Sequence, residues 1–197
     1  MTKKVLIIGA TGSLGRTLRK YLLDNSDYSL TLFSRSANRI NNIDPNREQV
    51  VTGNVLETDN LKSLIEGHDA VFAALTGDLG EMAKSIVSAM EQTQTTKLIF
   101  IASMGIYDEI PGSGNLSKNP MLRTYREGAD VVEASSLNYT VIRPGWFDNG
   151  SDVYETTVKG EAFGGHDVSR NSIAELVYRV IDDEKLFSRE SVGIHRP

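Results

Sequence analysis

Three glycines lie at three-residue spacing in the stretch GATGSLG: Gly9, Gly12 and Gly15. The stretch follows the apolar run VLII and precedes leucines that recur every four residues, so it marks a turn from a buried strand into a helix. Backbone N–H groups at such a turn bind phosphate with the help of the helix dipole. In this context the glycines favour dinucleotide binding over a purely structural turn. The predicted contacts come from Gly9, Thr11, Gly12, Ser13, Leu14 and Gly15.

The residues that end the second apolar run indicate which dinucleotide is bound. An acidic side chain there would accept hydrogen bonds from a ribose 2′-hydroxyl and would favour NAD. Here the run YSLTLFSR ends with Ser34 and Arg35, and Arg39 follows one helical turn later. A guanidinium pairs with the 2′-phosphate of NADP and stacks on the adenine ring. We therefore predict NADP(H), with NAD(H) as a second cofactor; the alternative is that Arg35 is a solvated surface cation.

The elements that must position these residues alternate regularly as far as about residue 143. Apolar runs predict strands at residues 5–8, 28–35, 49–55, 69–75, 97–103 and 139–143. Helical patterns lie between them, for example at residues 79–94 and 123–135. Strands that alternate with helices pair in parallel through right-handed crossovers. The pattern therefore predicts an α/β fold with a doubly wound parallel sheet.

Two segments interrupt the alternation. Residues 108–121 (DEIPGSGNLSKNPM) hold too much Pro, Gly, Ser and Asn for a regular element, and they follow the fifth predicted strand. Because ligands bind outside the carboxyl ends of such strands, this loop is placed to cover a substrate; a mobile surface connection is the alternative. Residues 144–197 contain an amphipathic helix and a short strand-like run. We expect them to form a small C-terminal extension of a single domain, residues 1–197.

Composition narrows the classes of function. The 197 residues carry a net charge of −5 and no basic block, which argues against a nucleic-acid backbone or an anionic membrane as partner. There are no cysteines, and the three histidines are scattered, so no metal-binding pattern is present. No apolar stretch is long enough for export or for spanning a membrane. We expect a cytoplasmic protein, a monomer or small homo-oligomer, whose partner is a small-molecule acceptor.

Motifs along nearly the whole chain resemble the short-chain dehydrogenase/reductase superfamily. They are GATGSLG, SR after the second predicted strand, GNV after the third, IASMGIY at the fifth and YTVIRPG at the sixth. The closest similarity is to its atypical branch of NAD(P)H-binding proteins, the NmrA-like and biliverdin reductase B-like group, which implies a Rossmann-like fold. The resemblance also implies further cofactor contacts. These are Asn54 (where Asp is more usual), Val55, Ala74, Leu75 and Thr76 around the adenosine, and Pro144, Gly145, Trp146 and Phe147 near the nicotinamide.

The catalytic pair implied by the resemblance is missing. Oxidoreductases of the superfamily use a Tyr-x-x-x-Lys pair on a helix, with the tyrosine as general acid. Counting back from YTVIRPG, the tyrosine position falls on Leu122 and the lysine position on Arg126. Leucine cannot transfer a proton, whereas Arg126 stays charged and would still bind the ribose hydroxyls. Tyr125 is predicted to be a poor substitute, because it lies about 100° from Arg126 around a helix.

Three other side chains remain as candidates near the acceptor. Ser103 ends the fifth predicted strand, where the family places a serine that binds the substrate carbonyl, and Tyr107 follows four residues later. We predict that Ser103 bonds a substrate or the nicotinamide amide and that Tyr107 flanks the pocket. The alternatives are that Ser103 only caps local backbone and that Tyr107 is merely an aromatic residue of a loop. Trp146, the only tryptophan, is placed to stack on a flat substrate, with core packing as the alternative.

Two classes of function fit these residues. The first is an NADP(H)-dependent oxidoreductase that transfers hydride to a flat acceptor, such as a flavin, a quinone or a linear tetrapyrrole. Such acceptors take a proton from solvent, so no acid is required at Leu122. The second is a non-catalytic NAD(P)-binding sensor, which the missing tyrosine fits equally well. A sugar-nucleotide epimerase or dehydratase is disfavoured by the missing pair and the small C-terminal region.

Overall fold

The computed structural model describes residues 2–197, apart from the side chains at positions 58 and 59. Within this part of the chain, a main sheet of eight strands runs in the order β3-β2-β1-β4-β5-β6-β10-β8, and β7 pairs with β9 beside it. The strands are β1 (Lys4–Ile8), β2 (Ser29–Ser34), β3 (Glu48–Thr52), β4 (Ala70–Ala73), β5 (Lys97–Ile101), β6 (Asn138–Pro144), β7 (Trp146–Asp148), β8 (Glu155–Val158), β9 (Asp167–Ser169) and β10 (Glu190–His195). The α-helices are α1 (Ser13–Asn25), α2 (Thr58–Ile65), α3 (Leu79–Met90), α4 (Arg123–Glu133) and α5 (Arg170–Asp182).

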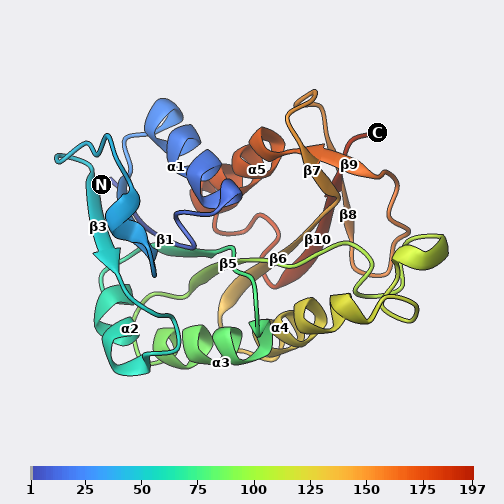
Figure 1. Ribbon diagram of the computed structural model, residues 1–197, viewed down its shortest axis with the longest axis horizontal. Helices are drawn as coiled ribbons and strands as arrows, with labels where there is room; N and C mark the ends of the chain where they lie inside the picture. The colour runs from blue at the N-terminus through green and yellow to red at the C-terminus, as the bar shows by residue number, and fades with distance from the viewer. Residues whose placement is uncertain (1) are drawn as a thin grey trace.

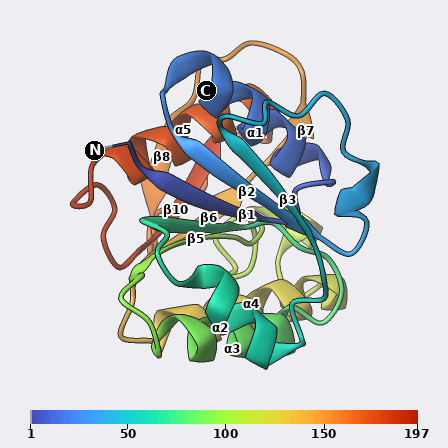
Figure 2. The same ribbon diagram turned by 90° about the vertical axis from the view of Figure 1, so that its left-hand side faces the viewer.

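The sheet is the middle of three layers (Figures 1 and 2). Figure 2 shows α1 and α5 on one face and α2, α3 and α4 on the other. The strand sequences explain this arrangement: every residue of β5, KLIFI, is buried, as central parallel strands require when both faces are covered. Each face has its own apolar core, one under α1 and α5 and one under α2, α3 and α4. The predicted doubly wound parallel α/β fold is confirmed.

The order of the strands places a crevice at one point of the sheet. From β1 the chain moves outward to β2 and β3 and then returns to β4 on the other side of β1. Helices on opposite faces therefore diverge outside the carboxyl ends of β1 and β4, which is where open α/β sheets bind ligands.

The C-terminal segment departs in detail from the expected extension. β10 pairs in parallel with β6, β8 pairs antiparallel with β10, and both thereby lengthen the main sheet. α5 packs beside α1 and completes the cover of that face. The short pair of β7 with β9 was not anticipated. The loop at residues 108–121 is also more ordered than predicted, since it contains the 3₁₀ turn Gly112–Gly114 and leads into a second, Pro120–Leu122.

Within the described residues, no helix combines the length and the apolar character needed to cross a lipid bilayer. The same residues contain no group of three or more His, Cys, Asp or Glu side chains arranged to hold a metal ion.

Candidate functional site

The glycine turn between β1 and α1 requires its glycines for steric reasons. Gly9 has a φ of +89°, and a Cβ there would lie 2.1 Å from the carbonyl oxygen of Ala74. A Cβ on Gly15 would lie 2.4 Å from the carbonyl oxygen of Gly9. The turn therefore packs backbone against backbone, both across to β4 and back onto the first turn of α1.

The start of α1 leaves backbone donors available. Gly12 is the N-cap residue and supplies no side-chain cap, and its own N–H donates to the carbonyl oxygen of Gly9 at 2.9 Å. The next three amides, at Ser13, Leu14 and Gly15, lie in the first helical turn, where N–H groups have no intrahelical acceptor. These donors and the positive end of the helix dipole suit a diphosphate.

A cavity of about 200 Å³ lies on the β2 side of this turn. The predicted cofactor residues among its lining are Gly9, Thr11, Gly12, Ser34, Arg35, Asn54, Val55, Ala74, Leu75 and Thr76. Thr11 donates to the hydroxyl of Ser34 at 3.2 Å and lies 3.4 Å from that of Ser36. Arg35 is exposed at the same cavity, and it makes no hydrogen bond or ion pair with any other residue that the structure describes. The cavity thus joins a hydroxyl cluster to an available guanidinium.

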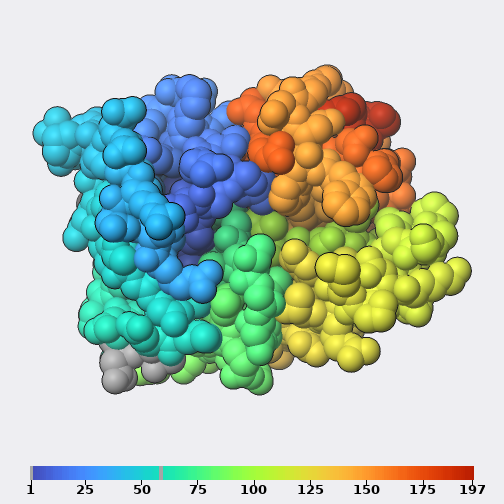
Figure 3. Space-filling view, in the orientation of Figure 1, coloured from blue at the N-terminus to red at the C-terminus, as the bar shows by residue number. Residues whose placement is uncertain are grey.

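A second cavity, of about 440 Å³, lies outside the ends of β4, β5 and β6. The predicted residues that line it are Gly12, Ser13, Leu14, Gly15, Ala74, Leu75, Thr76, Ser103, Pro144, Gly145, Trp146 and Phe147. Gly12, Ala74, Leu75 and Thr76 also line the first cavity, so the two form one cleft across the carboxyl end of the sheet. Figure 3 views this face of the molecule, where the N-terminal, central and C-terminal segments meet around a hollow.

The rim of the second cavity is apolar. Met121 is 80% exposed, Trp146 65% and Phe147 37%, although such side chains are normally buried. Met121 comes from the loop that precedes α4, whereas Trp146 and Phe147 come from β7. Apolar side chains from two different elements therefore lie at the rim of the cavity, an arrangement that suits a flat ligand between them.

Three predicted site residues do not line either cavity. Arg39 is exposed at the end of the 3₁₀ turn Ala37–Arg39. Arg126 donates to Asp130 at 2.7 Å and to the carbonyl oxygen of Ile106 at 3.2 Å, and therefore faces away from the cleft.

Tyr107 is the third of these residues. Its hydroxyl donates to Glu133, and the guanidinium of Arg143 and the ammonium of Lys159 lie 5.2 Å and 4.3 Å from the centre of its ring. Burial raises the pKa of Tyr107 above its ordinary value, and the hydrogen bond to Glu133 raises that pKa further. Tyr107 is thus held in a polar cluster behind the cleft and does not flank the acceptor cavity.

α4 differs from the expectation at one further position. Tyr125 lines the second cavity together with Leu122, whereas Arg126 does not. Leu122 and Tyr125 are three residues apart and so lie on nearly the same side of a helical turn. Tyr125, expected from its angle to Arg126 to be a poor substitute for the missing tyrosine, therefore lies at the cavity beside Leu122.

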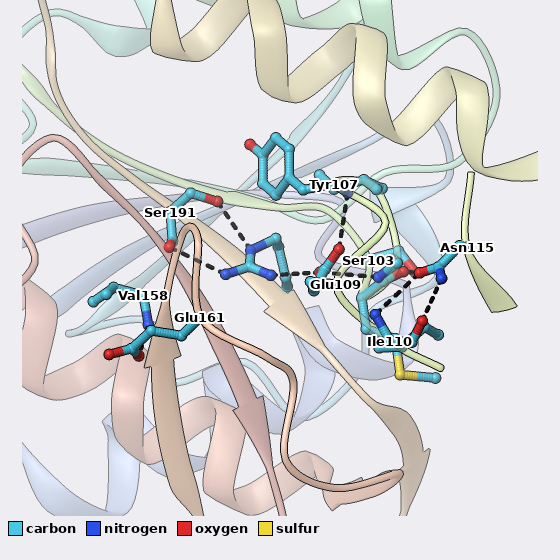
Figure 4. Close-up of polar contacts among 12 residues, drawn as sticks. Ser103, Tyr107, Glu109, Ile110, Asn115, Val158, Glu161 and Ser191 are labelled. Atoms are coloured by element: carbon cyan, nitrogen blue, oxygen red, sulfur yellow. Dashed lines mark hydrogen bonds and ion pairs between the residues drawn. The ribbon is translucent and has the colours of Figure 1, made fainter. Parts of the chain in front are cut away.

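Ser103 lies at the cavity, and a buried ion pair holds the chain just after it. The Ser103 hydroxyl donates to the carbonyl oxygen of Met104 at 3.1 Å, so the local backbone contact predicted as the alternative is present at the cavity wall. Glu109 accepts hydrogen bonds from the amides of Gly105 (3.0 Å) and Tyr107 (2.8 Å), and Figure 4 shows the contact between Tyr107 and Glu109. Arg143, on β6, pairs with Glu109 and donates to the hydroxyl of Ser191 at 3.1 Å.

The wall that carries Trp146 is fixed from behind. The Trp146 amide donates to the carbonyl oxygen of His166 at 2.9 Å, within the pairing of β7 with β9. A Cβ on Gly145 would lie 2.3 Å from that same carbonyl oxygen. Arg196 adds a two-pronged ion pair to Asp148, at 2.7 and 2.8 Å. The exposed Trp146 therefore stands on a short but braced strand.

Sequence reasoning missed several lining residues. In the first cavity these include Ser36, whose signal was the run SRS around Arg35. In the second they include Gly114, Asn119 and Met121, which come from the loop expected to cover a substrate. No sequence pattern distinguished these three from the other residues of that loop.

Comparisons with known proteins agree with this geometry. Residues 9–184 match the model of a family described as NAD(P)H-binding. The chain is 37% identical to a Rossmann-fold NAD(P)-binding family protein from Shigella flexneri, with a TM-score of 0.85 and coverage of 100% of this chain and 95% of that one. It is 27% identical to a short-chain dehydrogenase/reductase from Veillonella parvula DSM 2008 solved in complex with NADP, with a TM-score of 0.92 and coverage of 100% and 96%.

A curated relative is the uncharacterized sugar epimerase YhfK of Bacillus subtilis (strain 168), 24% identical over 196 residues, or 94% of this chain and 91% of that protein. The expected resemblance to short-chain dehydrogenases and reductases is confirmed by these neighbours. The uncapped glycine turn, the hydroxyl and guanidinium cluster beside it and the match over residues 9–184 lead to one conclusion: the chain belongs to the NAD(P)H-binding family of Rossmann-fold proteins.

Proposed function

We propose that the protein is an NADPH-dependent reductase that passes hydride to a flat small-molecule acceptor. The observation that carries this proposal is the single cleft, with a phosphate-binding turn at its middle, a polar cavity at one end and an apolar cavity at the other. A dinucleotide laid along this cleft would have its nicotinamide in the apolar cavity, next to the space for an acceptor.

The preference for NADP(H) rests on the first cavity. Arg35 and the hydroxyls of Thr11, Ser34 and Ser36 offer a positive charge and several donors to a 2′-phosphate. An acidic side chain, which would repel that phosphate and bind a 2′-hydroxyl instead, is absent from the described residues that line this cavity. The Veillonella relative was solved with NADP, which supports the same choice. NAD(H) remains a weaker second cofactor, because the contacts to the diphosphate are common to both.

The acceptor class follows from the second cavity. Bound NADPH supplies two electrons as hydride, and the acceptor takes up that hydride and a proton that comes ultimately from solvent. The chain contributes orientation, with Trp146 and Phe147 on one lip and Met121 on the other to hold a planar molecule against the nicotinamide site. Flavins and quinones have the required planarity.

A second candidate is a sensor that binds NAD(P) without chemistry. One observation favours it: Arg126, the residue that the family resemblance puts at the lysine position, is engaged with Asp130 and with the carbonyl oxygen of Ile106. The same resemblance puts Leu122 at the position of the usual acid. Under this hypothesis the exposed apolar rim would meet a protein partner and not a small acceptor.

Calorimetric titration with NADPH and NADH, followed by an acceptor assay, separates the two. We expect NADPH to bind at least about tenfold more tightly than NADH, the result of about 1.4 kcal/mol from the 2′-phosphate contacts. We also expect loss of the reduced-nicotinamide absorbance when a flavin or quinone is added. Tight NADPH binding with no turnover over a panel of acceptors would favour the sensor, and no binding of either nucleotide would overturn both hypotheses.

A further inference from the structure

The first turn of α4 brings a tyrosine to the acceptor cavity. Leu122 is buried and Tyr125 half-buried, and both line the cavity. The Tyr125 ring packs against the core between α4 and the sheet, which limits its motion. Its hydroxyl has no hydrogen-bond partner among the described residues. Tyr125 therefore combines a place in the cavity wall with a hydroxyl that no described residue engages.

Tyr125 is the only ionisable side chain in the described lining of this cavity. The lining holds no Asp, Glu, Lys, Arg or His, although these residue types make up much of the surface elsewhere. A cavity without fixed charges does not compensate the desolvation of a charged ligand, so it selects a ligand whose enclosed part is neutral.

Two other polar side chains of the cavity, Ser103 and Asn119, are less well suited to donate. The Ser103 hydroxyl already donates to the carbonyl oxygen of Met104. Asn119 uses its carboxamide oxygen to accept from the amide of Met121, which leaves only its NH₂ group as a donor. Tyr125 offers the more acidic hydrogen and therefore the stronger bond to an oxygen that gains negative charge.

We propose that Tyr125 is the hydrogen-bond donor to the acceptor in this protein, one turn removed from the position that Leu122 cannot serve. Its hydroxyl donates to a carbonyl oxygen of an uncharged acceptor in the second cavity. As hydride reaches the acceptor, negative charge grows on that oxygen, and Tyr125 stabilises this charge until solvent supplies the proton. The role of Tyr125 in turnover rests on the proposed reductase function; its role in binding an acceptor does not.

Tyr125→Phe tests the role of the hydroxyl while keeping the ring. Removal of one preorganised donor to a developing oxyanion lowers kcat by about 10²–10³-fold in other enzymes, and we expect a fall of at least about tenfold here. The affinity for NADPH and the unfolding midpoint should stay unchanged. Tyr178→Phe is the matched control, because Tyr178 lies on α5 against Tyr21, with a ring-centroid distance of 5.9 Å, on the other face of the sheet. Equal kcat values for the two variants would overturn the proposal.

A pair of acceptors with the same ring system tests the requirement for neutrality. The assay compares 1,2-naphthoquinone with 1,2-naphthoquinone-4-sulfonate, without oxygen, at saturating NADPH. We expect KM for the sulfonate to be at least about tenfold higher, since its charge finds no partner among the lining side chains. A KM for the sulfonate equal to or below that of the neutral quinone would overturn the neutral-acceptor part.

Binding measurements separate this inference from the reductase proposal. The only tryptophan, Trp146, lines the same cavity, so quinone binding to the NADP⁺ complex quenches its fluorescence. If the protein binds quinone more weakly after Tyr125→Phe but reduces none, the reductase proposal fails and the donor assignment stands. If the wild type reduces quinone and Tyr125→Phe changes neither kcat nor affinity, the assignment fails and the reductase stands. Absence of quinone binding to the NADP⁺ complex overturns the assignment.

Discussion

Arg143 and Glu109 form an ion pair that the fold encloses almost completely, with side-chain exposures of 0% and 5%. Arg143 is the penultimate residue of β6, next to Pro144, whereas Glu109 lies in the loop after β5 and accepts from the amides of Gly105 and Tyr107. One buried pair thus ties together two chain segments that line the acceptor cavity, the end of β6 and the loop after β5.

Glu109→Leu should destabilise the protein strongly, because it leaves the Arg143 charge buried without its partner. Breaking such a pair from one side costs about 3–5 kcal/mol, whereas removing both charges costs much less. Urea unfolding of Glu109→Leu and of the double variant Glu109→Leu/Arg143→Met measures the difference. The double variant should be the more stable of the two, and the opposite order would contradict a dominant role for the unpaired charge.

Arg35→Gln should weaken NADPH binding by about 10- to 100-fold, because a charge-assisted contact to the 2′-phosphate is lost. NADH, which lacks that phosphate, should bind as before. Arg39→Gln is the matched comparison, since Arg39 is also exposed but does not line the cavity. Calorimetry on both variants with both nucleotides checks this. Equal losses for NADPH and NADH would remove Arg35 from the 2′-phosphate site.

Gly9→Ala should unfold the protein or abolish nucleotide binding, because the new Cβ would lie 2.1 Å from a backbone oxygen at a φ of +89°. Gly67→Ala isolates the conformational part of this effect. Gly67 has a φ of +80°, and nothing lies within 4 Å of its Cβ position. The Gly67→Ala variant should lose only about 1–2 kcal/mol of unfolding free energy, as measured by thermal unfolding. Comparable losses at the two positions would show that the contact with Ala74 is unimportant.

Lys97→Met should stabilise the protein by about 1–3 kcal/mol, because the Lys97 ammonium is buried and finds no hydrogen-bond partner among the described residues. Lys3→Met is the contrasting variant and should destabilise, since Lys3 donates to the carbonyl oxygens of Ile181 (2.6 Å) and Asp182 (2.9 Å). Chemical unfolding of both variants measures whether each substitution raises or lowers the free energy of unfolding. Stabilisation by Lys3→Met, or destabilisation by Lys97→Met, would contradict this account.

The buried Lys97 should also make the stability of the protein depend on pH. Burial lowers the pKa of Lys97 below its ordinary value of 10.5, so the unfolded chain holds more protons in the interval between the two values. Stability therefore rises with pH across that interval. The advantage of Lys97→Met over the wild type should shrink as the pH is raised toward 10.5 and should be constant below the lowered pKa. If the difference in stability between Lys97→Met and the wild type grew as the pH was raised, the lowered pKa of Lys97 would be contradicted.

The layout of the sheet and the phosphate turn were predictable because local patterns determine them. The runs that became β1 and β5 are apolar throughout their buried length, and Gly9 and Gly15 occupy places where the chain tolerates no side chain. Ser34 and Arg35 could be placed because the end of β2 adjoins that turn. The position of a residue at the end of a strand is determined by the order of the strands in the sheet.

The residues on α4 and in its neighbouring loop were not predictable in the same way. The direction in which Arg126 and Tyr125 face depends on where α4 begins and how it is rotated against β5, which no spacing in the sequence records. Tyr107 looked like a cavity residue by its distance from Ser103, but its ring is drawn toward Glu133, Arg143 and Lys159, partners that are distant along the chain. The directions of these side chains are therefore determined by tertiary contacts.

The floor common to both cavities, Gly12 with Ala74, Leu75 and Thr76, has a kinetic consequence. The second cavity also includes Ser13, Leu14 and Gly15, whose amides we expect to bind the diphosphate, so an acceptor that entered first would obstruct the nucleotide. Productive turnover should accordingly follow a compulsory sequence, nucleotide first on and last off, with inhibition by excess acceptor competitive against the nucleotide.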